Sequence, residues 1–358
     1  MIRREIYKFD ILTRMFSAGA EPQKKAEIRA SEIRAQLRWW FRILGGFTND
    51  TRSLKEQECY YFGGVGKVPI RGKLCIRVRI SAVLQQEVKD ADELGAGLNT
   101  SLGYLLFPLR SNDRVDAGRA HFLPNSADVA AFELELLIDG TEEEWCNIRS
   151  LISVFGNLGS LGFRSRRCMG AIAFHGDGPV SLNHALARFK ASDQVLIREL
   201  SSGNATVDGC VTVLANWLKD WRSYGSHKTK LNEGGRGFRF AEKDHDAGIG
   251  KGDTAYRSAI GLPIIQQYSS GGRIKNEWEA IDAERFASPV ILRPHRKDDG
   301  RYIPLVIFAD LYKWGDGRKV QLYRKNAITK KKELFRLLCG SCELYEEMKK
   351  DSQLKNFI

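Results

Sequence analysis

The chain has 358 residues, 43% of them apolar, and carries 56 Lys and Arg against 44 Asp and Glu, a formal net charge of +12. This composition excludes a disordered tail, and the length predicts two domains. No run of 18 apolar residues occurs, and the charged N-terminus is not followed by the apolar stretch of a secretory signal. We therefore expect a cytoplasmic protein without membrane association, and the basic excess favours a polyanionic partner.

The first strong pattern is a helix over residues 30–44, which follows a short strand over residues 5–12 and a polar loop. We expect Ser31 to be its N-cap. Apolar side chains at helical spacing form one stripe on this helix, namely Ile33, Leu37, Trp40, Phe41 and Leu44. A second stripe consists of three arginines spaced four residues apart, Arg34, Arg38 and Arg42. Like charges at this spacing repel, so the stripe favours contact with an anion. The alternative is a solvated face with carboxylate partners elsewhere in the fold.

Further strands and a second helix follow in the first half of the chain. Residues 73–84 alternate apolar and basic side chains, 103–110 resemble a strand interrupted by Pro108, and 132–138 alternate again with glutamates outward. Thr141 and Glu144 form the capping-box pattern of a helix whose core stripe comprises Trp145, Ile148, Leu151, Ile152 and Phe155. A short strand over 171–174 completes the order β-α-β-β-α-β, which predicts an α+β fold of the ferredoxin-like or RRM-like plan.

A glycine- and arginine-rich loop precedes that last strand. Residues 156–170 read GNLGSLGFRSRRCMG and combine four glycines with three arginines. Glycine allows backbone N–H groups to approach a phosphate closely, and arginine binds phosphate with two donors. The alternative is a turn that packs against the sheet. Neither a Walker motif nor a dinucleotide-binding motif occurs, which speaks against a mononucleotide-binding fold.

The second half is less regular, and we interpret it as a divergent second domain with helical insertions. We place the first domain at 1–178 and the second at 179–358. Helices are expected over 181–200 and 207–222, strands over 261–265, 287–294 and 302–310, and a terminal helix from about residue 328. Between them lies a long loop rich in Gly, Lys and Arg, residues 223–256.

Cysteine and histidine patterns give no reason to expect a cofactor or a metal. Cys339 and Cys342 have CxxC spacing inside the expected terminal helix, but no second pair or nearby histidine would complete a metal site. The dipeptide His245-Asp246 falls in the long loop without further ligands. Seven scattered cysteines also do not suggest a disulfide framework.

Four segments together resemble a known family: YKFDILTRMFSAGAE, SEIRAQLRWWFRILGG, GSLGFRSRRCMGAI and ASPVILRP. The chain resembles the RAMP superfamily of CRISPR-associated RNA-binding proteins, and within it the first-named subunit of the type III-B (Cmr) effector complex. The resemblance implies two ferredoxin-like domains whose cleft binds single-stranded guide or target RNA in antiviral defence. It also implies other Cmr subunits as partners and no catalytic role.

The RNA-binding positions that this resemblance carries over lie on the first helix and the glycine-rich loop. They are Arg34, Arg38, Trp39, Arg42, Gly159, Gly162, Arg164, Ser165, Arg166 and Arg167. Family loops commonly read R-R-G-aromatic-G, whereas here Cys168 and Met169 precede Gly170. Trp39 lies off the apolar stripe, so it either stacks on a base or packs under a neighbouring segment.

Two nuclease interpretations remain as alternatives. The first is a metal-independent RAMP endoribonuclease that processes CRISPR repeat RNA, with His227 or His245 as acid or base. Such enzymes often place a histidine in or near the first helix, and residues 30–44 contain none. The second is a subunit that cleaves target RNA with an acidic residue, for which Asp10 is the nearest candidate.

Overall fold

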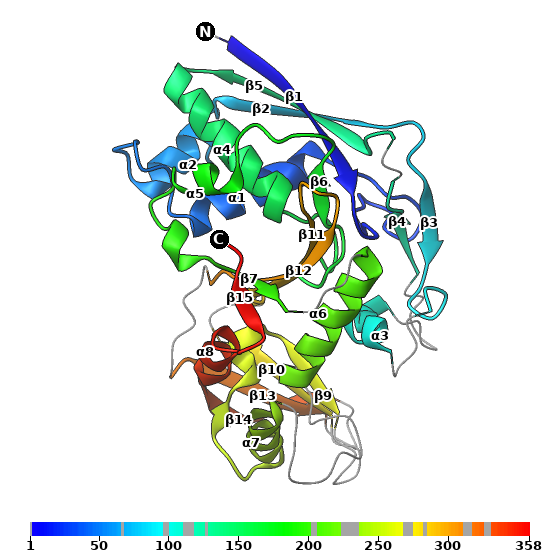
Figure 1. The fold of residues 1–358 in the computed structure, drawn as a ribbon. Helices are drawn as coiled ribbons and strands as arrows, with labels where there is room; N and C mark the ends of the chain where they lie inside the picture. Colours follow the sequence, from blue (N-terminus) through cyan, green and yellow to red (C-terminus); the bar gives the residue numbers. More distant parts are fainter. Residues whose placement is uncertain are drawn as a thin grey trace. The chain divides into compact units, whose positions relative to one another are not determined.

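The computed structural model shows a mixed α+β fold, which confirms the expected class (Figure 1). It describes residues 2–65, 68–95, 100–109, 118–125, 128–201, 206–222, 236–267, 275–281, 285–310, 317–325 and 331–358. The chain divides into two compact units, each built from separate segments. The first comprises residues 1–215, 291–309 and 356–358, and the second comprises residues 216–290 and 310–355.

The first unit begins with a four-stranded antiparallel sheet in the order β2-β5-β1-β6. Its strands are β1 (Ile2–Ile11), β2 (Leu74–Ile80), β5 (Phe132–Asp139) and β6 (Ile172–Phe174). Helix α1 (Ala30–Ile43) follows β1, and α4 (Glu142–Leu158) follows β5. The β-α-β-β-α-β order expected from the sequence is therefore confirmed for this part of the chain.

Helices α1 and α4 bury the two predicted apolar stripes. All ten residues named for these stripes are buried. Thr141 and Glu144 form the expected capping box at the start of α4. The helix begins at Ala30, as expected, but the N-cap prediction was wrong, because the N-cap is Arg29, two residues before Ser31, and it forms no capping hydrogen bond. Ser31 lies inside the first turn.

Between β2 and β5 the chain forms elements that differ from the prediction. Residues 103–110 are not a strand but belong to helix α3 (Ser101–Leu106) and the 3-10 turn η1 (Phe107–Leu109). Thr100 caps α3 by accepting the Gly103 N–H, and a cap of this kind favours a helix over an extended segment. A separate hairpin consists of β3 (Gln86–Lys89) and β4 (Arg119–Phe122). Helix α2 (Leu54–Phe62), which follows α1, was also not foreseen.

A second four-stranded sheet has the order β11-β12-β7-β15. Along the chain its elements are β7 (Leu196–Leu200), α6 (Val207–Arg222), β11 (Val290–Arg296), β12 (Tyr302–Phe308), α8 (Glu343–Lys349) and β15 (Leu354–Asn356). Along the chain, the strands of this sheet come in the order β7, β11, β12 and β15. In the sheet they lie in the order second, third, first and last, which is also the strand order of the first sheet. The order β-α-β-β-α-β occurs twice in the chain, and long segments are inserted into the second copy.

The prediction of a helix over 181–200 was largely wrong, whereas α6 matches its predicted bounds. Only α5 (Leu182–Leu186) and the 3-10 turn η2 (Ser192–Gln194) are helical there, and β7 follows them. Ile197 of β7 pairs with Ile307 of β12, more than a hundred residues away, so the strand depends on a non-local partner.

The second unit contains a five-stranded sheet in the order β8-β14-β13-β10-β9. Its strands are β8 (Thr254–Ala255), β9 (Ile264–Gln267), β10 (Lys275–Ala280), β13 (Lys319–Lys325) and β14 (Lys332–Gly340). Helix α7 (Phe238–Ile249) and the 3-10 turn η3 (Arg257–Ile260) belong to the same unit. Part of the expected loop 223–256 is thus helical, and residues 223–235 lie outside the described part.

The prediction of a terminal helix from about residue 328 was wrong for residues 332–340, where β14 pairs with β13. Only the short helix α8 is helical in the described part of that range. Cys339 lies at the end of β14, and Cys342 precedes α8. Neither of them forms a disulfide. None of the described helices is long and apolar enough to cross a membrane.

Candidate nucleic-acid interface

The glycine- and arginine-rich loop between α4 and β6 is packed tightly against its neighbours. Gly162 has a φ of +86°, and a Cβ at this position would lie 2.7 Å from the backbone of Phe16. A Cβ on Gly170, whose φ is +64°, would lie only 1.9 Å from the carbonyl oxygen of Leu161. Both positions need glycine for packing and backbone conformation. Their approach to RNA stays a prediction.

Two other residues of the loop adopt left-handed backbone conformations that are uncommon outside glycine. Arg164 has a φ of +64° and Cys168 a φ of +67°. The Arg164 Nε donates to the carbonyl of Leu105 at 2.6 Å, and the Arg167 N–H donates to the carbonyl of Arg164 at 2.7 Å. Strained conformations of this kind cluster at functional sites, and here they give the loop one defined shape.

Strand β11 holds the loop from the other side. The Cys168 N–H donates to the Leu292 carbonyl at 2.9 Å, and the Leu292 N–H donates to the Arg166 carbonyl at 3.3 Å. The fully buried Arg293 donates from Nη1 to the Gly159 carbonyl and from Nη2 to the Ile172 carbonyl, both at 2.6 Å. Burial lowers the pKa of Arg293 to about 9, which leaves it charged at neutral pH. Two family-like segments more than a hundred residues apart in the chain therefore meet at this point.

The arginine stripe of α1 is bound largely within the protein. Arg34 donates from Nη1 to the Phe62 carbonyl at 3.1 Å and from Nη2 to the Leu74 carbonyl at 3.2 Å. Its guanidinium therefore links α1 to the end of α2 and the start of β2.

Arg38 and Arg42 converge on one carboxylate, that of Glu58 in α2. The Arg38 Nε donates to Glu58 Oε1 at 2.7 Å, and the Arg42 Nε and Nη2 donate to Oε2 and Oε1 at 2.6 Å. Burial alone would raise the pKa of Glu58, but the hydrogen bonds from Arg42 and Arg38 outweigh it and hold the pKa below its ordinary value. Glu58 thus neutralises part of the positive stripe, as the alternative interpretation of this helix anticipated.

Trp39 and Arg166 are the predicted site residues that bring the helix and the loop together. The Arg166 guanidinium carbon lies 4.7 Å from the centroid of the Trp39 ring, and Trp40 packs edge-on against Trp39 at 4.9 Å. An arginine over a tryptophan face is a favourable cation–π contact. Trp39 is half-buried and its indole Nε1 is buried without a hydrogen-bond partner in the described structure. The pair presents an aromatic and a cationic group at one place.

The remaining predicted residues lie around this pair with mixed exposure. Arg167 is almost buried and donates from Nη1 to the Arg166 carbonyl at 2.9 Å, while Ser165 is half-buried in the same turn. Gly159 ends α4 and gives its carbonyl to Arg293. The structure therefore places the ten predicted residues around one helix and one adjoining loop, several of them in structural roles.

Three residues that shape this region were missed from the sequence. Glu32 accepts the Gly162 N–H at 2.7 Å and thereby connects α1 to the loop, Glu58 neutralises the arginine stripe, and Arg293 binds two loop carbonyls. A signal for α2, and hence for Glu58, was present in Ser53 and Glu56, whose spacing is that of a capping box. No local pattern indicates the partners of Arg293.

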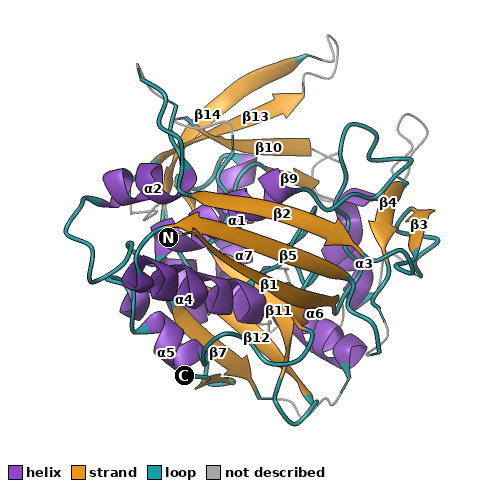
Figure 2. Cartoon of the chain, turned by 90° about the horizontal axis from the view of Figure 1, so that it is seen from above, coloured by secondary structure: helices purple, strands orange, loops and turns teal. Residues whose placement is uncertain are grey.

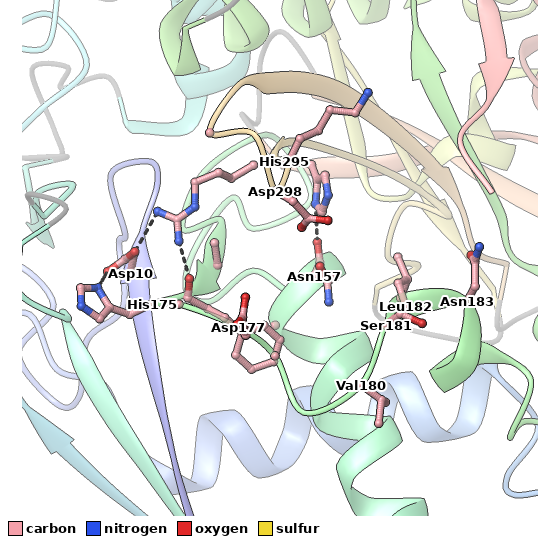
Figure 3. A pocket seen from close by; sticks show the side chains of 18 of the residues that line it. Asp10, Asn157, His175, Asp177, Val180, Ser181, Leu182, Asn183, His295 and Asp298 are labelled. Atoms are coloured by element: carbon pink, nitrogen blue, oxygen red, sulfur yellow. Dashed lines mark hydrogen bonds and ion pairs between the residues drawn. The ribbon is translucent and has the colours of Figure 1, made fainter.

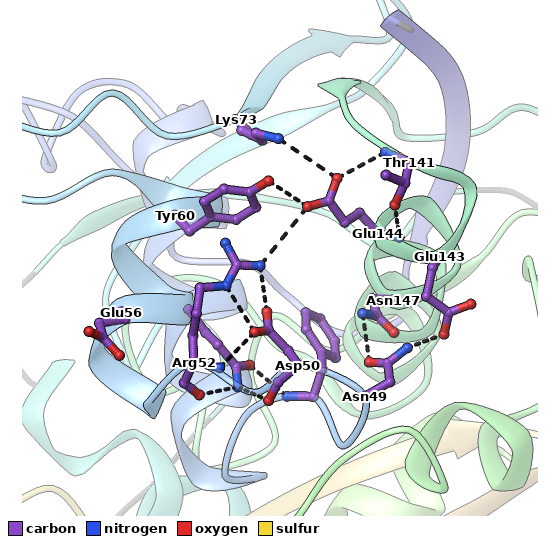
Figure 4. A network of polar contacts seen from close by, with 12 residues as sticks. Asn49, Asp50, Arg52, Glu56, Tyr60, Lys73, Thr141, Glu143, Glu144 and Asn147 are labelled. Atoms are coloured by element: carbon purple, nitrogen blue, oxygen red, sulfur yellow. Dashed lines mark hydrogen bonds and ion pairs between the residues drawn. The ribbon is translucent and has the colours of Figure 1, made fainter.

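A polar network connects α2 to the start of α4 (Figure 4). Arg52 donates to Asp50 at 2.6 Å, and its guanidinium carbon lies 3.4 Å from the centre of the Tyr60 ring. The Tyr60 hydroxyl donates to Glu144 at 2.5 Å, and Lys73 lies 3.8 Å from the same carboxylate. The glutamates of this helix start are therefore engaged in structure.

A polar cavity of about 810 Å³ lies elsewhere in the first unit (Figure 3). At one side Asp10 accepts hydrogen bonds from Asn125 and His175, both at 2.9 Å, and lies 2.8 Å from Arg296 Nη1. The charged residues that line it carry both signs: Asp10, Asp177, Asp298, Arg296 and Lys297. Because both signs are present, this cavity is a weaker match to a polyanion than an arginine-rich surface.

The candidate catalytic residues have different surroundings in the described structure. His245 lies on α7 rather than in a loop, with its Nδ1 3.8 Å from Asp246. Asp10 is buried and shared by three donors, and His227 lies outside the described residues. Within the described residues, no group of three His, Cys, Asp or Glu side chains is arranged to hold a metal ion.

Comparison with known proteins identifies the family of this region. A model of the RAMP superfamily matches residues 8–173. The CRISPR system Cmr subunit Cmr1-1 of Pyrococcus furiosus is 28% identical over 149 residues, which are 41% of this chain and 40% of that protein. The Cmr subunit Cmr1-2 of the same organism is 25% identical over 179 residues, 47% of this chain and 92% of that protein.

The fold comparison extends over almost the entire chain. The crystal structure of Cmr1 from Pyrococcus furiosus in its apo form aligns with a TM-score of 0.57 over 99% of this chain and 98% of that one, at 14% identity. Residues 8–173 match the RAMP superfamily, the family that the motifs of this chain predicted. Within the superfamily the chain resembles the Cmr1 type, whose fold it shares.

Proposed function

We propose that this chain is a non-catalytic, cytoplasmic RNA-binding subunit of a type III-B CRISPR effector complex, in which it contacts guide or target RNA and other Cmr subunits during antiviral defence. The observation that carries the RNA-binding role is the contact of Arg166 with Trp39, which joins the two family-like motifs. An aromatic face beside a guanidinium is the arrangement on which single-stranded bases stack. The similarity to proteins named Cmr subunits supports the place in a complex.

We also propose that the two β-α-β-β-α-β series are two ferredoxin-like domains, divided near residue 178. Both sheets have the same strand order, and β6 of the first series ends at Phe174 while β7 of the second begins at Leu196. The five-stranded sheet would then be built from insertions in the second domain.

Binding of fluorescently labelled single-stranded RNA, measured by anisotropy at several salt concentrations, tests the RNA-binding role. We expect salt-dependent binding by the wild-type chain and a loss of affinity of about threefold to tenfold for Arg166→Ala, because one phosphate contact and one stacking surface are altered. Arg301→Ala is the matched control, because Arg301 is an exposed residue of the first unit and this substitution also removes one positive charge.

A gel of the same samples tests the absence of catalysis. Intact RNA after incubation is expected. Cleavage that persists in EDTA would instead favour the metal-independent endoribonuclease, and equal affinities of wild type, Arg166→Ala and Arg301→Ala would remove the loop from the binding site.

A further inference from the structure

The face of the first sheet that points away from α1 and α4 carries a second basic surface. Figure 2 shows β2, β5 and β1 side by side, with no helix drawn over them. We define the open sheet face by the outward side chains of these strands, Arg4, Ile6, Lys8, Arg77, Arg79, Glu133 and Glu135. Four cations thus stand beside two carboxylates, and strand alternation adds a third, the exposed Asp139, at the end of β5.

The cations on β2 are only loosely paired. Arg77 Nη1 and Arg79 Nη2 each lie 3.8 Å from Glu135 Oε2, which is beyond hydrogen-bond distance, and both side chains are 63% exposed. Glu135 is itself buried, and its Oε2 accepts no hydrogen bond in the described structure. The donors of both guanidinium groups are therefore available for an anion from solution.

The second row of cations lies across the sheet on β1. Arg4 Nε is 2.5 Å from Glu135 Oε1, whereas Lys8 Nζ lies 3.9 Å from Glu133. Since β5 separates β1 from β2, the two rows are about 10 Å apart, and the arginines of β2 are about 6.6 Å apart along the strand. Such spacing suits successive phosphates of an extended strand.

The occupant that this chemistry favours is RNA rather than protein. The whole chain has a net charge of +12, and Arg77 and Arg79 have no carboxylate within hydrogen-bond distance, so a polyanion can reach their donors without displacing a close partner. The aromatic side chains of β1, Tyr7 and Phe9, are buried on the opposite side, so no ring is available for base stacking. Contacts would thus be to the backbone and independent of base sequence.

We propose that the open sheet face binds the sugar–phosphate backbone of single-stranded RNA, with Arg77 and Arg79 as the principal contacts and Lys8 as a supporting one. This surface is distinct from the pair formed by Trp39 and Arg166, and it rests on the proposed RNA-binding function. It extends the RNA path onto the strands β2 and β1.

The test compares double variants in the full chain with a labelled 30-nucleotide single-stranded RNA of mixed sequence. Arg77→Ala/Arg79→Ala is expected to lower the affinity about tenfold and to reduce the log–log salt slope by about 1.4, since two phosphate contacts are lost. Arg77→Lys/Arg79→Lys keeps the charges and should retain most of the affinity. Lys24→Ala/Lys25→Ala removes the same charge from exposed positions outside the open sheet face and is expected to change the affinity less than twofold.

Circular dichroism and thermal melting establish that each variant is folded. If the double alanine variant melts early, the single variants Arg77→Ala and Arg79→Ala decide the result, each with a smaller loss of affinity. If the wild-type chain binds RNA and a folded Arg77→Ala/Arg79→Ala variant binds with the same affinity and the same salt slope, this inference alone is overturned. The search would then turn to an acidic protein partner for the open sheet face. A wild-type chain that binds no RNA at low salt overturns both this inference and the proposed function.

Discussion

The arginines of α1 and those of the open sheet face carry the same charge in very different surroundings. Arg38 and Arg42 donate hydrogen bonds of 2.6–2.7 Å to Glu58, whereas Arg77 and Arg79 lie 3.8 Å from their nearest carboxylate. A stripe of positive residues in a sequence therefore shows how much charge a surface can carry. Whether that charge is available to a ligand depends on carboxylates contributed by other elements.

The largest effect on stability is expected at Gly162, in the loop that adjoins α1, because this position depends on packing rather than on charge. Gly162→Ala places a Cβ against the backbone of Phe16 at a φ of +86°, so we expect the free energy of unfolding to fall by about 2–4 kcal/mol. Gly176→Ala is the matched control, because Gly176 has a φ of +90° with nothing within 4 Å of a Cβ. Urea denaturation of both variants measures the difference. Equal losses would mean that the close approach to Phe16 is unimportant.

A smaller effect on stability, with a sharper effect on binding, is expected for Glu58→Ala. This variant removes the shared acceptor of Arg38 and Arg42, which should cost about 1–2 kcal/mol because Glu58 is buried while the two arginines are partly solvated. The two released arginines should then raise RNA affinity a few-fold if α1 lies along the RNA path. Anisotropy measurements with the folded variant decide this, and unchanged affinity would confine the arginine stripe to a structural role.

The smallest effect concerns acid pH. The pKa of Glu58 is lower in the folded chain than its ordinary value near 4.3, so its contribution to stability is complete above that value and is lost as the pH falls through the lowered pKa. The Glu58→Gln variant lacks this titration. Denaturation curves at pH 6 and pH 3 should therefore show a larger loss for the wild-type chain than for Glu58→Gln, and parallel losses would contradict the assignment.

Local patterns predicted the elements whose signals lie within one segment. The stripe of α1 and the capping box of Thr141 and Glu144 depend on residues within a few turns of each other, and both were predicted correctly apart from the N-cap at Ser31. By contrast, β7 and β14 were assigned to helices. Their strand state depends on pairing with β12 and β13, which a single-segment pattern cannot reveal.

The candidate site was predictable to a similar extent. The sequence indicated which segments carry arginine and glycine, and the structure places Trp39 and Arg166 in contact. The sequence could not indicate that Glu58 would face the α1 stripe or that Arg293 would bind the carbonyls of Gly159 and Ile172. Both partners come from other elements, and the chain distance to Arg293 is more than a hundred residues.

The repeated strand order has a consequence for how the chain acquires its structure during synthesis. All strands of the first sheet are available once residue 174 has left the ribosome, so this sheet can form before the other two, although β1 pairs with strands more than a hundred residues away. The five-stranded sheet needs β9 and β10 as well as β13 and β14, and the sheet β11-β12-β7-β15 needs its final strand near residue 356. The strands of these two sheets that are made first remain unpaired until the later ones have been synthesised. Ribosome stalling or truncation after residue 310 would leave a folded first sheet beside incomplete later ones.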